Sequence, residues 1–173
     1  GAQVDADMSP YRPGSHLSRF NENTTDEWQP MPAALCQVAS DALRIAHQTQ
    51  GAFDPTVGPI VARFGFGPIK GGSGSYQDIN VGSDALSKGA PHLTLDLCGI
   101  AKGYALDQMA NALRSAGVKN ALIEVGGEVA AIGHHPSGRD WQVAVADPTA
   151  SDFRVHKIIQ PGTYAVATSG HAA

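Results

Sequence analysis

The chain has 173 residues, of which 42% are hydrophobic and 16% are charged, and its formal net charge is −4. This length and composition are those of a folded globular protein with a buried core, and they exclude a disordered chain. The sequence has no basic run and no apolar run near the roughly 18 residues of a membrane span. We therefore expect no nucleic acid as a partner and no membrane-spanning helix.

The sequence alone does not determine the cellular compartment of the protein. The chain begins with Gly1 rather than Met and carries no signal peptide, so we expect that an upstream segment has been lost. Its two cysteines, Cys36 and Cys98, are too few to form a metal site alone. We expect two buried thiols rather than a disulfide between them.

Two helices are predicted from apolar or small residues spaced three and four apart. The first covers residues 32–50, begins with a proline and is followed by Gly51, which ends it. The second covers residues 98–116, starts at the turn that contains Gly99 and is ended by Gly117. Its buried face is predicted to consist of Leu106, Met109, Ala110 and Leu113.

Strands are predicted before and after the second helix. In residues 93–97 Leu alternates with polar residues, and residues 120–125 also alternate, so each segment is typical of a strand with one buried face. With the helix between them they form a strand–helix–strand unit. Further strands, separated by turns that contain Pro or Gly, are predicted at residues 128–132, 141–146, 153–159 and 164–167. The predicted fold class is α+β, a mainly antiparallel sheet with helices packed on it.

Residues 51–59 (GAFDPTVGP) follow the first helix directly. Their small residues and prolines restrict the backbone, while Asp54 and Thr56 offer polar groups. On its own this pattern favours a turn in which Asp54 accepts hydrogen bonds from neighbouring backbone N–H groups. A loop that contacts a ligand is the alternative.

Residues 95–104 (LDLCGIAKGY) are the most informative segment. Here the positive end of a helix dipole and free N–H groups are expected to face whatever lies before the helix. Lys102 adds a positive charge to the first helical turn, where a phosphate would explain its presence. The alternative is that Asp96 caps the helix and Lys102 pairs with a surface carboxylate. The local pattern favours neither interpretation.

Residues 124–128 (EVGGE) place two glycines between strands, with a carboxylate on each side. A tight hairpin with solvated acids is the favoured interpretation. The alternative is a flat backbone platform against which a ring can lie.

Taken in order, these segments resemble the motifs of the ApbE family of FAD:protein FMN transferases. The resemblance spans nearly the whole chain at matching spacing. The matching segments are residues 7–15 (DMSPYRPGS) with 18–21 (SRFN), 51–59 with 64–68 (FGFGP), 95–104 with Asp107, 124–128 with Gly133, Trp141 and Pro148, and 167–170 (ATSG).

The resemblance implies an ApbE-like, T-fold-like domain and a transferase that requires Mg²⁺. Such an enzyme takes FAD, moves its FMN half onto a Thr or Ser of an acceptor flavoprotein and releases AMP. Hydrolysis of FAD to FMN and AMP is one alternative, and a non-catalytic flavin-binding module is another. The resemblance also implies a periplasmic protein, anchored to the membrane through a lipoprotein signal upstream of this chain. A cytoplasmic location is the alternative.

By motif, the resemblance assigns Tyr11 to the flavin, Asp96 to a hydrogen bond with FAD, and Lys102 to the FAD phosphates. It assigns the backbone carbonyl of Gly99 as one Mg²⁺ ligand. The other residues that it places along FAD are Ala52, Phe53, Asp54, Glu124, Gly126 and Gly127.

The chain also departs from the family pattern. Cys98 stands where a small residue such as Gly or Ser is common, and His171 stands where Ser or Asp is usual. The family's upstream strand is expected outside this chain, as are a C-terminal His-x-x-Asp-Pro segment and an Asp/Thr pair that completes the Mg²⁺ site. We therefore expect residues 1–173 to be one incomplete domain with the catalytic residues unknown. Alone, it should bind FAD and Mg²⁺ weakly and transfer FMN poorly or not at all.

Overall fold

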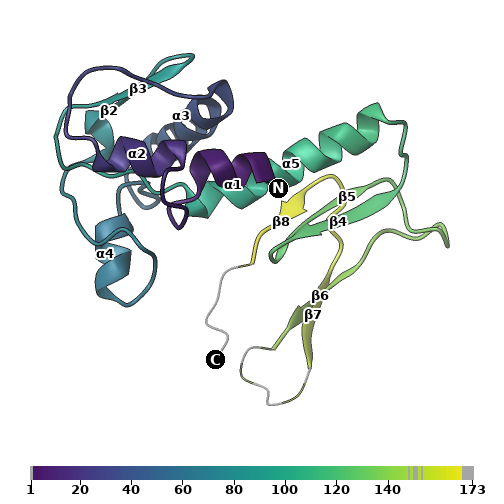
Figure 1. Ribbon diagram of the computed structural model, residues 1–173. Helices are drawn as coiled ribbons and strands as arrows, with labels where there is room; N and C mark the ends of the chain where they lie inside the picture. Colours follow the sequence, from purple (N-terminus) through teal and green to yellow (C-terminus); the bar gives the residue numbers. More distant parts are fainter. Residues whose placement is uncertain (1, 148, 150–151, 153, 169–173) are drawn as a thin grey trace. The chain divides into compact units, whose positions relative to one another are not determined.

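The computed structural model describes residues 2–147, 149, 152 and 154–168 (Figure 1). Its architecture is α+β, and the strand pairs in the described part of the chain are all antiparallel, as predicted. The chain divides into two compact units, Gly1–Ala101 and Lys102–Ala173, and helix α5 (Cys98–Ser115) runs across the division. The prediction that residues 1–173 form one domain stays a prediction. Among the described helices, none combines the length and the apolar character that a membrane crossing requires.

The first unit packs helices on a small sheet. Helix α3 contacts β2 and β3, and its predicted apolar face is confirmed, because Leu35, Val38 and Ala42 are fully buried. The sheet has the strand order β1-β3-β2. The elements of this unit are α1 (Ala2–Met8), α2 (His16–Glu22), β1 (Gln29–Pro30), α3 (Ala33–Gln48), α4 (Gly58–Arg63), a 3-10 turn (Tyr76–Asp78), β2 (Ile79–Val81) and β3 (Ala85–Lys88).

The second unit packs helix α5 on a hairpin. Leu106 and Ala110 of α5 form a core with Ile123, Ala130 and Ile132. The sheet has the order β4-β5-β8, and β6 and β7 form a separate pair (Figure 1). The strands are β4 (Ala121–Val125), β5 (Glu128–Ile132), β6 (Val143–Ala146), β7 (Val155–Ile159) and β8 (Ala165–Val166).

Helix α5 buries a narrower face than predicted. Leu106, Ala110 and Leu113 lie along the core, at a spacing of four and three residues. Met109, predicted on the same face, is 41% exposed, so that assignment is wrong. The remaining apolar residues are enough to dock the helix, because the strands that it covers present small side chains such as Ala130.

The predicted strand at residues 93–97 is wrong, although its burial alternates as expected. Leu93, Leu95 and Leu97 are fully buried, yet the backbone of this segment pairs with no strand in the described part of the chain. The Asn21 side chain takes the place of a neighbouring strand: its Nδ2 donates to the Leu95 carbonyl at 2.9 Å, and its Oδ1 accepts from the Leu95 N–H at 2.8 Å. The alternation therefore reflected side-chain burial and not sheet pairing, and the strand–helix–strand unit lacks its first strand.

The later strands are confirmed, and the last three are shorter than predicted. Phe153, at the start of one predicted strand, lies outside the described residues. The two cysteines form no disulfide, as expected. Cys36 is buried, but Cys98 is exposed at the start of α5, so the prediction of two buried thiols is wrong for the second.

Candidate functional site

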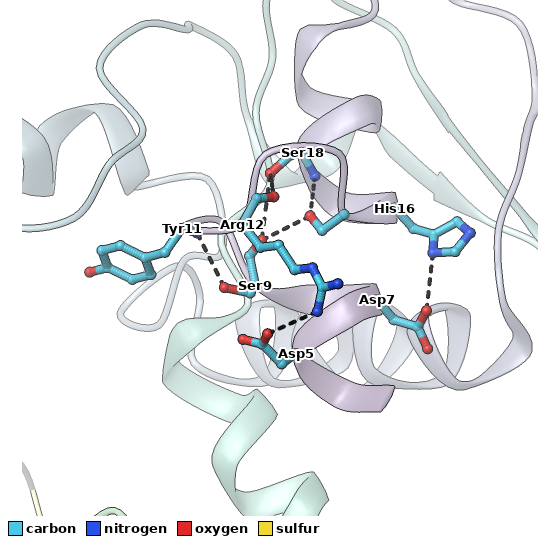
Figure 2. Close-up of polar contacts among 8 residues, drawn as sticks. Asp5, Asp7, Ser9, Tyr11, Arg12, His16 and Ser18 are labelled. Atoms are coloured by element: carbon cyan, nitrogen blue, oxygen red, sulfur yellow. Dashed lines mark hydrogen bonds and ion pairs between the residues drawn. The ribbon is translucent and has the colours of Figure 1, made fainter. Parts of the chain in front are cut away.

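Tyr11 lies in the turn between α1 and α2, and 65% of it is exposed. The turn is held by side chains: the Ser15 hydroxyl donates to the Ser9 carbonyl at 2.8 Å, and the Ser18 hydroxyl donates to the Arg12 carbonyl at 3.1 Å. Figure 2 shows the Tyr11 ring pointing away from this network. A fixed turn with an outward aromatic ring suits stacking on a flat ligand. The contact of Tyr11 with a flavin stays a prediction.

Polar side-chain contacts connect the turn and the start of α2 to α1. The Arg12 guanidinium lies 3.4 Å from the Asp5 carboxylate, and both side chains are exposed. His16 Nδ1 lies 3.0 Å from Oδ1 of Asp7, which is almost completely buried (Figure 2). Gln3 donates to the other Asp7 oxygen at 2.9 Å. The Arg12–Asp5 pair joins the turn to α1, and the His16–Asp7 contact joins α2 to α1, so they fix the base from which Tyr11 projects.

The loop after α3 forms the predicted Asp54 turn. Asp54 Oδ1 accepts hydrogen bonds from the Thr56 N–H at 2.8 Å and from the Thr56 hydroxyl at 2.7 Å. Ala52 is exposed, and Phe53 is half-buried. The turn predicted for this segment is therefore confirmed, and the contact of its residues with FAD stays a prediction.

The start of α5 lies against this loop. The Asp96 N–H donates to the Pro55 carbonyl at 2.7 Å, and a Cβ atom on Gly99 would lie only 3.1 Å from Cε2 of Phe53. A glycine at this position therefore lets the Phe53 ring approach the helix closely. Of the predicted site residues in the first unit, the fold thus brings Phe53 together with Asp96 and Gly99.

Most of the first amide groups of α5 have partners inside the protein. Asp96 Oδ1 accepts from the Cys98 N–H at 2.9 Å, which confirms the capping role that was one alternative for Asp96. The Leu97 carbonyl accepts from Ile100 at 3.0 Å and from Ala101 at 2.8 Å. The helix dipole remains, but the expected set of free N–H groups is smaller than the sequence suggested.

Lys102 pairs with a carboxylate in the second unit. Its Nζ lies 2.8 Å from Oε1 of Glu128 and donates to the Gly126 carbonyl at 3.2 Å. The Lys102 side chain is 49% exposed, whereas that of Glu128 is 10% exposed. The predicted carboxylate partner is therefore present, although it is buried rather than on the surface. Sequence reasoning gave Glu128 no role, and the only signal for one was the second acid of the EVGGE segment.

The β4–β5 hairpin turns at two glycines, as the tight-hairpin interpretation predicted. Gly126 and Gly127 have φ angles of 58° and 96°, which two-residue hairpin turns require and which glycine adopts most readily. The Glu124 carboxylate accepts from the Gly127 N–H at 2.7 Å. Space beside Gly127 is open, because a Cβ there would meet no atom within 4 Å. Glu124 is exposed, whereas Glu128 is buried, so only one acid is solvated.

The magnesium site stays a prediction within the residues that the structure describes. No three His, Cys, Asp or Glu residues gather there in a way that could hold a metal ion. The predicted ligand, the Gly99 carbonyl, lies at the start of a helix. Pro148 and residues 169–170, which belong to the resembling motifs, lie outside the described residues, as does His171.

Two curated proteins that are similar in sequence to this chain bear one name. The chain is 36% identical to the FAD:protein FMN transferase of Vibrio cholerae, over 97% of this chain and 54% of that protein. It is also 36% identical to the FAD:protein FMN transferase of Haemophilus influenzae, over 96% of this chain and 54% of that protein. The chain therefore spans about half the length of the curated relatives that it matches.

Solved structures agree with this result. The flavin transferase ApbE of Vibrio cholerae superposes with a TM-score of 0.87 at 35% identity, covering 99% of this chain and 60% of that one. The ApbE protein of Thermotoga maritima superposes with a TM-score of 0.81 at 29% identity, covering 97% and 59%. The ApbE family itself matches residues 2–173. Sequence and fold agree over nearly all of this chain, which therefore belongs to the ApbE family.

Proposed function

We propose that this chain provides the FAD-binding part of an FAD:protein FMN transferase. The observation that carries the proposal is the 36% identity, over 97% of the chain, with a relative that bears this name. The exposed Tyr11 ring, the start of α5 and the Lys102 side chain are the features of the described structure that support it. Each offers a group that a flavin or a pyrophosphate requires.

The proposed reaction breaks the phosphoanhydride bond of FAD and forms a phosphoester bond to the acceptor. A Thr or Ser hydroxyl of the acceptor attacks the phosphorus atom of the FMN half, and the pyrophosphate bond to AMP breaks. The hydroxyl proton goes to solvent or to a base, and AMP leaves with the bridging oxygen. Because the transition state carries its charge on phosphate oxygens, the protein contributes chiefly positioning and positive charge.

Lys102 is the residue of this chain best suited to stabilise the negative charge on the phosphate oxygens. An ammonium group has three N–H donors, and the described structure uses two of them for Glu128 and Gly126. The third can donate to a phosphate oxygen while Glu128 holds the group in place. Asp96 is occupied with capping α5 through one oxygen, and its other oxygen can accept a hydrogen bond from FAD. The magnesium requirement is inferred from the family resemblance alone.

Equilibrium dialysis with FAD tests the binding part of the proposal. The wild-type protein should bind FAD, and Lys102→Met should weaken binding about tenfold or more, because it removes one hydrogen bond between charged groups. Lys119→Met is the matched control: it makes the same substitution at another exposed lysine of the second unit, so its affinity should be unchanged. Absence of FAD binding by the wild type, or equal losses in both variants, would contradict the proposal.

Because residues 1–173 alone are expected to transfer FMN poorly or not at all, the reaction is tested with the protein produced from its natural gene, incubated with FAD and magnesium chloride. One arm contains a flavoprotein with an Asp/Ser-Gly-Ala-Ser/Thr-like acceptor site, and the other arm contains none. Release of AMP together with an FMN adduct on the acceptor, detected by mass spectrometry, is the expected result. AMP and free FMN in both arms would identify a hydrolase instead. Binding of FAD without AMP release in either arm would identify a flavin-binding module.

We also propose a periplasmic location with membrane anchoring, since the family resemblance implies it. Fractionation of cells that produce the protein from its natural gene tests this location. Recovery with the periplasmic or membrane fraction is expected, and recovery with the cytoplasmic fraction would contradict it.

A further inference from the structure

Lys88, the last residue of β3, is fully buried. Its Nζ donates to the carbonyl oxygens of Phe20 at 2.9 Å, Asn21 at 3.3 Å and Leu93 at 2.9 Å. It also lies 5.1 Å from the centre of the Phe20 ring, close enough for a cation–π contact. Three N–H donors thus meet three acceptors, so the charged form of the amine is completely satisfied.

A lysine in this place is costly. Lysine is almost never fully buried, and a Met side chain would fill a similar volume without losing hydration of a charge. Burial accordingly lowers the pKa of Lys88 below its ordinary value of 10.5. The local structure must therefore gain something that an apolar side chain would not supply.

The three acceptors belong to two segments that the sequence keeps far apart. Phe20 and Asn21 lie near the end of α2, where helix carbonyls lack partners in the helix. Leu93 begins the segment of residues 93–97, which has buried leucines but pairs with no strand among the residues that the structure describes. Lys88 therefore supplies the end of α2 and this segment with hydrogen bonds that regular secondary structure would otherwise provide.

Asn21 makes a second connection between the same two segments. Its carboxamide forms two hydrogen bonds with the backbone of Leu95, at 2.8 and 2.9 Å. The next residue, Asp96, is held by the Pro55 carbonyl and itself caps α5 through Cys98. Lys88 and Asn21 thus fix the chain immediately before the residues predicted to contact FAD and metal.

We propose that Lys88 is a positioning residue for the FAD site. By joining the end of α2 to residues 93–95, it fixes Asp96 and the first turn of α5 in the arrangement that FAD requires. Asn21 is its partner in this role. The inference rests on the proposed function, since it assumes that Asp96 and the start of α5 contact FAD.

Lys88→Met tests the inference by two measurements. Affinity for FAD, measured by equilibrium dialysis, should fall about tenfold to a hundredfold, as for the loss of a residue that orients a binding group. Without FAD, amide hydrogen exchange should increase in the peptide that covers residues 93–98. The second measurement needs no ligand.

Val38→Ala is the control for a general loss of stability. Val38 is buried on α3 in the same unit and belongs to neither connection. Each variant is measured at a temperature chosen so that Lys88→Met and Val38→Ala have the same unfolding free energy. Under these conditions Val38→Ala should keep wild-type affinity for FAD and wild-type hydrogen exchange in residues 93–98. Equal losses of affinity in the two variants would overturn the inference, as would wild-type affinity in Lys88→Met.

Asn21→Asp is a second variant in case Lys88→Met does not fold. It keeps an oxygen for the Leu95 N–H but places a carboxylate oxygen against the Leu95 carbonyl. The same loss of affinity and of protection is expected, and wild-type values for both would overturn the inference. If the wild type binds no FAD, the proposed function is wrong. Unchanged exchange in residues 93–98 would instead show that the positioning inference is wrong.

Discussion

The Lys102 ammonium and the Glu128 carboxylate lie 2.8 Å apart, with the lysine half-exposed and the glutamate buried. The two residues therefore differ in how well water can replace a lost partner. Water can solvate Lys102 if Glu128 is lost, whereas a buried Glu128 carboxylate without Lys102 has no comparable substitute. The pair also orients the one cation that we assign to the FAD phosphates.

Removal of the two partners should consequently destabilise the protein by different amounts. Lys102→Met should lower the free energy of unfolding by about 1–3 kcal/mol, because it leaves a buried carboxylate with one fewer donor. Glu128→Gln should lower it by less than about 1 kcal/mol. Urea unfolding measures both values. The exposed pair of Arg44 and Asp41 provides the control, since Asp41→Asn should cost only about 0–1 kcal/mol. Equal losses for Lys102→Met and Glu128→Gln would contradict the asymmetry.

Two glycines in α5 should respond oppositely to the same substitution. A Cβ at Gly103 would meet no atom within 4 Å, so Gly103→Ala should raise the unfolding free energy by about 0.5–1 kcal/mol through the higher helix propensity of alanine. A Cβ at Gly99 would lie 3.1 Å from the Phe53 ring, so Gly99→Ala should lower it by about 1–2 kcal/mol. Thermal or urea unfolding measures whether each substitution raises or lowers the unfolding free energy. Stabilisation by both substitutions would show that Phe53 moves without cost.

The long elements could be predicted because their side-chain pattern is local. Helix α3 has enough residues for its helical spacing of apolar residues to be recognised, and strand β5 is bounded by glycines, so both were found close to the predicted positions. Strands β1 and β2 have only two and three residues, so they are too short for an alternation to be recognised. Their existence depends on pairing with β3, which the sequence does not reveal.

The contacts of the candidate site also differ in whether local sequence predicts them. The turns of Asp54 and Asp96 join residues two positions apart, so residue type and sequence position predicted their hydrogen bonds. The bond from Lys102 to Glu128 depends on how α5 packs on the β4–β5 hairpin, and it was foreseen only as an unspecified carboxylate. Lys88 was not foreseen at all, because its acceptors are backbone carbonyls, which carry no signature in the sequence.

Cys36 should make stability fall at alkaline pH. Burial, with a smaller contribution from the negative charge of Asp84, raises the pKa of its thiol above the ordinary value of 9.0. The unfolded chain therefore loses this proton at a lower pH than the folded protein does. Above about pH 9 the folded state binds more protons, so the unfolding free energy decreases with pH. The advantage of the wild type over Cys36→Ala, measured by urea unfolding, should be present at pH 7.5 and decrease above pH 9. A constant difference would contradict the assignment.

Lys88 should affect stability and FAD binding with opposite signs as the pH rises. Its pKa is lowered by burial, so below 10.5 there is a range in which the unfolded chain is protonated and the folded protein is not. The unfolded state binds more protons in that range, and the unfolding free energy of the wild type relative to Lys88→Met should increase with pH.

The neutral amine, however, has only two N–H donors for the three carbonyls of Phe20, Asn21 and Leu93. One connection to the end of α2 or to residues 93–95 is then lost, and the start of α5 is less firmly held. The ratio of FAD affinities between wild type and Lys88→Met should therefore decrease toward one over the same pH range. Titration of FAD itself affects both proteins equally and cancels in this ratio. If the ratio stays constant or increases while the relative stability increases, the charge on Lys88 does not position the site.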